Sequence, residues 1–125
     1  MQNNNYKLIN FRIMKIHCDV DPDSINSPIS VSVENSISSY PHTDRSVKKG
    51  LLKVETSITS PDCEEFEIQF TSESIFSFDE TPEDFHEAFH ACCYPIAEDR
   101  ICKAVRELSL IMGMNPLDIR PSDAE

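Results

Sequence analysis

Glycine is scarce in this chain, which has only 2 among its 125 residues. A phosphate-binding loop needs several glycines so that backbone N–H groups can surround the phosphates, and no such loop can be built here. The G-x-S-x-G turn that carries the nucleophile of α/β-hydrolases is also missing. These absences exclude two common motifs, one for nucleotide binding and one for serine hydrolysis.

Long hydrophobic runs are missing too. No apolar stretch approaches the ~18 residues of a membrane span, and the start, MQNNNYK, lacks the apolar core of a targeting peptide. The 5 cysteines are odd in number and form no C-x-x-C pair, so a disulfide framework is not expected. We therefore expect a cytoplasmic protein that does not insert into membranes.

Basic residues are outnumbered, with 11 Lys and Arg against 22 Asp and Glu and a formal net charge of −11. Nucleic-acid affinity comes mainly from Lys and Arg that displace counterions from phosphates, so nucleic acid is not expected as a partner. Basic partners are favoured, although the same charge also keeps a small protein soluble. With 39% hydrophobic residues, the chain can bury about two thirds of its unfolded surface as one domain, residues 1–125.

Four runs rich in β-formers precede a long helical pattern, and they predict strands at residues 6–20, 29–38, 51–59 and 66–78. In the first run the apolar face switches between Ile13 and Met14, which predicts a bulge or a strand buried on both sides. In the fourth run Ile75, Phe76 and Phe78 break the alternation. Residues 21–24 predict a turn, and the short connections favour antiparallel pairing.

The helical pattern runs from Pro82 to Met112. Pro82 suits the first turn of a helix, Thr81 can act as the N-cap, and Gly113 ends the pattern. An unbroken helix of this length would be roughly 45 Å long, so a bend is expected at Pro95. Apolar residues recur every three or four positions and predict one buried face: Phe85, Phe89, Cys92, Cys93, Ile96, Ala97, Ile101, Ala104, Val105, Leu108, Ile111 and Met112.

Strands followed by one helix predict an α+β fold, in which a four-stranded antiparallel sheet is covered on one face by a long C-terminal helix. Residues 1–5 are polar and are expected to be frayed. Residues 114–125 contain two prolines, Pro116 and Pro121, which exclude a second ordinary helix. We expect an extended tail there.

From Phe66 onward the chain resembles the SecB export-chaperone family. In FEIQFTSESIFSF, Ile75 and Phe76 match the Ile-Phe element that ends the family's last strand. Cys93 falls near the family cysteine, and the YPIA step at residues 94–97 matches an aromatic-Pro-x-Ala step in the family's long helix. The Pro-Leu pair at 116–117 follows the helix in the same order, and the four preceding strands agree in number and order.

The resemblance implies a dimer or a dimer of dimers that binds unfolded polypeptides through exposed apolar grooves, without a cofactor or a reactive group. Two departures bear on export. Glu73 and Ser74 stand where the family usually has Gly-Gly, and the family's second helix, with the tail that contacts the SecA motor, is absent. The resemblance therefore points less to export than to SecB-like relatives that serve toxin–antitoxin systems, or to an orphan branch of the family.

The candidate peptide-binding surface is aromatic. It comprises Phe76, Phe78 and Tyr94, together with Phe11 and Tyr40. An unfolded client would gain about 25 cal/mol for each Å² of apolar surface that it buries there. The alternative is that most of these side chains lie in the core or in a dimer contact, since large apolar residues usually lie inside.

A second motif favours different chemistry, because His86, Glu87 and His90 form the zincin pattern H-E-x-x-H. On a helix both imidazoles could ligate one Zn²⁺ while Glu87 activates a bound water. The third ligand could be Glu107, Cys93 or His17. The amphipathic stripe explains the same spacing, since both histidines flank Phe89 at the edge of the buried face.

We therefore predict a non-enzymatic, oligomeric SecB-like chaperone that needs no cofactor or metal and binds unfolded or partner polypeptides. Two alternatives stay open. One is a small zinc metallopeptidase built on the histidine motif. The other is a non-catalytic adaptor that has the same fold but binds no client.

Overall fold

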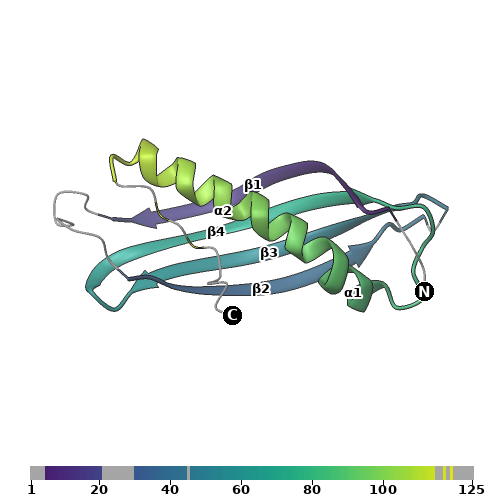
Figure 1. Cartoon of the computed structure of the whole chain (residues 1–125), viewed down its shortest axis with the longest axis horizontal. Helices are drawn as coiled ribbons and strands as arrows, with labels where there is room; N and C mark the ends of the chain where they lie inside the picture. The colour runs from purple at the N-terminus through teal and green to yellow at the C-terminus, as the bar shows by residue number, and fades with distance from the viewer. Residues whose placement is uncertain (1–4, 21–29, 45, 115–116, 118, 120–125) are drawn as a thin grey trace.

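The computed structural model describes residues 5–20, 30–44, 46–114, 117 and 119. Four antiparallel strands form one sheet in the order β1-β4-β3-β2 (Figure 1). The strands are β1 (Lys7–Asp19), β2 (Ser32–Pro41), β3 (Lys49–Ser60) and β4 (Cys63–Ser77). This architecture confirms the predicted fold class. The predicted turn at residues 21–24 lies outside the described residues, as do most of the predicted frayed start and extended tail.

Three consecutive helical elements follow the sheet: α1 (Phe85–Ala88), a π-helical segment η2 (Phe89–Cys93) and α2 (Tyr94–Ile111). Figure 1 shows them crossing one face of the sheet diagonally, from α1 beside β2 to the end of α2 beside β1. No helix in the described part of the chain is long and apolar enough to cross a membrane.

The two central strands bury every second residue beneath the helix. In β3 the side chains of Leu52, Val54 and Ile58 are fully buried, as the alternation predicts. Along β4 the buried set continues without a break from Phe66 to Phe76, and on to Phe78 just after the strand, because Ser72 and Ser74 occupy the intervening buried positions. The predicted break of alternation is therefore wrong, since small serines fill the sites where the pattern lacks an apolar residue.

The outer strands differ from the prediction in detail. The register of β1 against β4 shifts between Leu8 and Asn10 and again between Ile13 and Lys15, which confirms the predicted bulge. Most β1 side chains are exposed, because β1 is an edge strand. At the other edge, β2 extends to Pro41, which pairs with Gly50. An edge strand tolerates proline since one side of its backbone needs no partner.

The helix begins later than predicted. Its N-cap is Asp84, whose side chain accepts a hydrogen bond from the backbone N–H of Glu87 at 3.1 Å. Thr81 and Pro82 precede the helix, and Pro82 is buried there. Thr and Asp are both good caps, so the sequence alone does not choose between them. Capping by Asp84 makes Phe85 the first helical residue, directly over the sheet.

Pro95, where a bend is predicted, lies in the first turn of α2, directly after the π-helical segment. A proline in a helix interior leaves one carbonyl without its donor and collides with the carbonyl four residues earlier. At the start of a regular segment both penalties are smaller. The π segment thus lets the helical path continue through a proline.

The buried face of the helix repeats every four residues rather than every 3.6. In a regular α-helix such a row turns about 40° around the axis at each step. The π-helical turn between Phe89 and Cys93 contains about one residue more than an α-helical turn. Between these two residues the row of side chains therefore turns around the axis in the opposite direction. The buried row is Phe85, Phe89, Cys93, Ala97, Ile101, Val105 and Ser109, and Cys102 is buried beside it.

The drift shows at the end of α2. Ser109, last in the row, accepts a hydrogen bond through its Oγ from the backbone N–H of Leu117 at 3.0 Å, so it faces the segment after the helix. Three residues predicted for the buried face are instead exposed: Cys92, Ile96 (38%) and Ile111 (82%). For these residues the predicted stripe is wrong, since the actual row is narrower.

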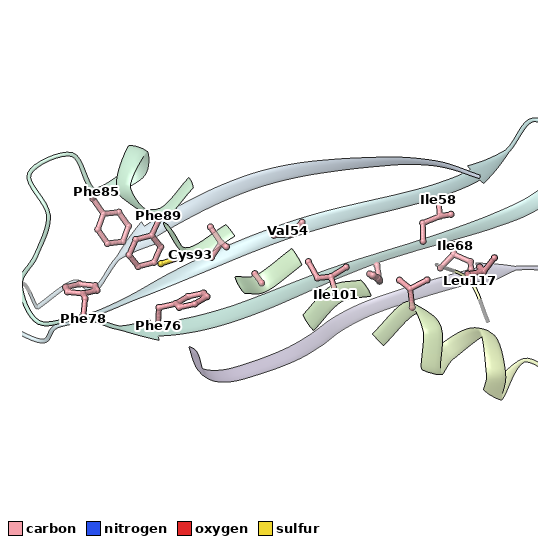
Figure 2. Close-up of a cluster of buried hydrophobic side chains, with 14 of the residues drawn as sticks. Val54, Ile58, Ile68, Phe76, Phe78, Phe85, Phe89, Cys93, Ile101 and Leu117 are labelled. Carbon is pink, nitrogen blue, oxygen red and sulfur yellow. The ribbon is translucent and has the colours of Figure 1, made fainter. Parts of the chain in front are cut away.

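Four phenylalanine rings gather at one end of the core, Phe76, Phe78, Phe85 and Phe89, while Ile58, Ile68 and Leu117 lie toward the other (Figure 2). At the first of these ends Phe85 stacks on Phe89 with ring centroids 4.2 Å apart, and both rings meet Phe78 edge-on. Gly50 of β3 lies directly beneath them. A Cβ atom built there would be 2.5 Å from Phe89 Cζ and 2.6 Å from Phe85 Cζ.

Candidate functional site

Two of the predicted peptide-binding aromatics lie in the core. Phe76 is 0% exposed and Phe78 6% exposed, and each packs its ring against Phe89. The helix covers both side chains, so neither can meet a peptide in this structure. For these two residues the core alternative is correct. Both residues lie on the same face as the buried residues earlier in β4. The sequence did not show this, because Ser72 and Ser74 are polar residues at buried positions between them.

The other three candidates lie apart. Phe11 of β1 is half-buried beside the helix, with the guanidinium carbon of Arg100 4.8 Å from its ring centroid. Tyr94 lies on the opposite flank of the helix, bonded to Asn35 of β2. Tyr40 pairs with Leu51 on the face of the sheet that the helix leaves open. The five residues therefore do not form one surface.

Tyr94 belongs to a polar chain that joins the helix to the sheet. Thr56 Oγ1 donates to Asn35 Oδ1 at 2.8 Å, Asn35 Nδ2 donates to the Tyr94 hydroxyl at 2.9 Å, and that hydroxyl donates to Glu98 Oε2 at 3.0 Å. Burial raises the pKa of Tyr94 to about 12, helped by its hydrogen bond to Glu98. This chain of bonds fixes the distance between α2 and β2.

The histidine motif does not form a metal centre. His86 lies in α1 and His90 in η2, both exposed, and Ser39 Oγ lies within hydrogen-bonding distance of His86 Nδ1. Cys93, one possible third ligand, is buried, and burial raises the pKa of its thiol to about 12, so it stays protonated. Over the described residues, no group of three or more His, Cys, Asp or Glu could hold a metal ion. The zinc peptidase is therefore not supported.

Strand β1 carries an exposed apolar surface that the sequence interpretation did not single out. Ile9 and Ile16 are 49% exposed, Met14 48% and Ile13 39%. The strand order leaves one backbone edge of β1 without a partner in the described sheet. The sequence shows that β1 is apolar on both faces, but only the strand order shows that it is an edge. An apolar edge strand readily pairs with another chain.

The open face of the sheet is hollowed at its middle. The hollow has a volume of about 930 Å³ and is lined mainly by polar side chains from all four strands. Charges of both signs line it, from Lys15 on β1, Glu34 on β2 and Glu55 on β3. Such a lining suits a polar or mixed partner and differs from the apolar surface of β1.

Comparison with known proteins places the fold. The chain is similar in structure to the Mycobacterium tuberculosis SecB-like chaperone Rv1957, solved in complex with a ChAD peptide from the HigA1 antitoxin. The TM-score is 0.69 at 13% sequence identity, over 92% of this chain and 86% of that chain. No protein-family model and no curated protein matches the sequence. The likeness establishes a SecB-like fold.

Proposed function

We propose that this chain is a SecB-like chaperone that binds unfolded or partner polypeptides and catalyses no reaction. One observation carries the proposal: a SecB-like fold exposes four large apolar side chains along the edge of β1 that has no partner strand among the described residues. The antitoxin peptide bound to the similar chaperone supports a polypeptide as the partner.

The edge of β1 offers a client both polar and apolar contacts. An extended segment can add to the sheet as a further strand and hydrogen-bond to the free backbone groups. Its side chains can then cover Ile13 and Ile16, which are 39% and 49% exposed. Phe11 lies half-buried on the same strand, so we propose it as an additional contact. Tyr40 and Tyr94 are proposed contacts at other places on the surface.

The test is the fluorescence anisotropy of a labelled, permanently unfolded protein titrated with the chain at two temperatures. Binding with a negative heat-capacity change indicates apolar burial. Ile13→Asp combined with Ile16→Asp should weaken binding about tenfold or more, because each aspartate places a charge on the apolar edge. Leu110→Asp is the matched control, since Leu110 is 52% exposed but lies on α2. Absence of binding to the unmodified chain would favour the non-catalytic adaptor.

We also propose that the chain forms homo-oligomers through the same edge, because an edge strand pairs with any extended strand. In an antiparallel pair of β1 strands with Ile13 opposite Ile13, Lys7 of each copy faces Asp19 of the other, which is a favourable charge pair. Sedimentation velocity of the same variants separates the two uses of the edge. If the variants sediment as a smaller assembly but bind the client with unchanged affinity, the edge serves subunit contact alone.

A further inference from the structure

The open face of the sheet is organised in transverse rows, which the strand register defines. Residues paired across neighbouring strands point to the same side, so each row crosses the sheet. Three neighbouring rows at one end of this face differ from the rest. In order they are Lys7, Ser77 and Lys49; then Asn10, Ile75, Leu51 and Tyr40; then Arg12, Glu73, Lys53 and Ser38.

The middle row is apolar over three strands, and we name Tyr40, Leu51 and Ile75 the apolar row. Tyr40 is 48% exposed, and Leu51 and Ile75 are partly exposed. No helix in the described part of the chain covers this face, since the helix lies on the side of Gly50 and Leu52. With strands about 4.8 Å apart, the row and its β1 end span about 14 Å.

The rows on either side are basic. They hold four cations, Lys7, Lys49, Arg12 and Lys53, against one carboxylate, Glu73, so the three rows carry a net charge of +3 in a chain of −11. Glu73 is held by Arg12, which donates from Nε at 3.1 Å and from Nη2 at 2.8 Å. Neither Lys49 nor Lys53 forms an ion pair within the described residues.

The two lysines of β3 flank the apolar row symmetrically. Lys49 and Lys53 each lie two residues from Leu51, so their Cα atoms are about 6.8 Å on either side of it. A matching partner needs a narrow apolar stripe with negative charge along both sides. An extended strand cannot supply this, because its successive side chains point to opposite faces. An amphipathic helix can, since its apolar stripe lies between two polar flanks.

We propose that this end of the open face is a docking surface for an acidic amphipathic helix of a partner polypeptide. About nine residues of helix cover the 14 Å row at 1.5 Å per residue. The helix lays its apolar stripe on Tyr40 and Leu51, and carboxylates on its two flanks meet Lys49 and Lys53. This surface goes beyond the proposed client binding, which centres on the edge of β1 and shares only Tyr40 with it.

The test uses a labelled 14-residue peptide of Glu, Leu and Ala with one leucine stripe flanked by glutamates. A second peptide has Gln in place of every Glu. The unmodified chain should bind the Glu peptide more tightly than the Gln peptide, and added salt should reduce the difference. Tyr40→Ser should weaken binding about tenfold, and Lys49→Gln and Lys53→Gln about twofold to fivefold each.

Two control variants fix the place of binding. Lys15→Gln lies on the same face but in the hollow, and Lys103→Gln lies on α2, where Lys103 pairs with Asp99 at 3.2 Å. Both should leave peptide affinity unchanged, and unfolded-protein binding should be unchanged in the four lysine variants. Equal binding of the two peptides, or equal losses in the control variants, would overturn the proposal. Binding to phosphatidylglycerol vesicles is measured with the same variants. The proposal is also overturned if the variants lose vesicle binding but keep peptide binding.

Discussion

A methyl group added at Gly50 should lower the free energy of unfolding, because there is no room for it. A Cβ atom there would lie 2.5 Å from Phe89 Cζ, 2.6 Å from Phe85 Cζ and 2.9 Å from Phe85 Cε1. Ordinary carbon contacts are about 3.5–4.0 Å, so both rings must move by about 1 Å. Phe89 is 0% exposed and is surrounded by Tyr6, Phe76 and Phe78, which leaves no free space for that movement.

The magnitude follows from two opposing terms. Overpacking a well-filled core costs about 1–3 kcal/mol. Replacing glycine in a strand recovers about 0.5–1 kcal/mol, because alanine loses less backbone entropy on folding. We expect Gly50→Ala to lower the free energy of unfolding by about 2 kcal/mol, since two rings are displaced at once. For a domain of this length, that lowers the melting temperature by about 8 °C.

Urea denaturation followed by far-UV circular dichroism measures the change. Gly113→Ala is the matched control, because Gly113 has φ of +81° and no atom within 4 Å of an added Cβ. It should cost about 1 kcal/mol from backbone strain alone. In a Phe85→Leu background Gly50→Ala should cost less, whereas Gly113→Ala should cost the same. An unchanged or raised midpoint for Gly50→Ala would refute the steric argument.

Two further predictions concern polar groups beneath the helix. Ser74→Ala should stabilise the protein by about 1 kcal/mol in urea denaturation, because Ser74 Oγ is the buried side-chain oxygen without a hydrogen-bond partner among the described residues. Ser72→Ala should stabilise it less, since Ser72 Oγ lies 3.5 Å from Val54 O. A lower stability of Ser74→Ala would contradict this reasoning. Tyr94→Phe should cost about 1 kcal/mol at pH 7. The folded chain keeps the Tyr94 proton up to its raised pKa of about 12, whereas the unfolded chain releases it near pH 10, so this stabilisation is lost as the pH rises through that window. The difference between the unmodified chain and Tyr94→Phe should therefore shrink from pH 10 to 12, and a constant difference would be the contrary result.

The sheet was predictable because β3 and β4 are buried on one face and polar on the other. Leu52, Val54 and Ile58 lie where a period of two places them. The bulge in β1 was predictable for the same reason, since a change of apolar face within one strand requires an extra residue. Local periodicity is sufficient to predict a strand wherever one of its faces is buried and the other is exposed to solvent.

The candidate site was less predictable, because it depends on which strand lies at an edge and which face the helix covers. Phe76 and Phe78 were expected on the surface and lie in the core. Ile13 and Ile16 were expected only as strand residues and are exposed at the edge. Neither outcome can be read from a single strand, since both depend on the strand order β1-β4-β3-β2.

The π-helical segment also bears on how this fold can vary in length. An extra residue in a continuous α-helix turns every later side chain by about 100° and would move the buried row off the sheet. Here the segment Phe89–Cys93 absorbs about one residue within a single wide turn, so α1 and α2 both keep their buried faces on the sheet. Homologous helices that differ by one residue at this point can therefore present the same faces to the sheet. A sequence alignment of such proteins should then place its gap inside the helix.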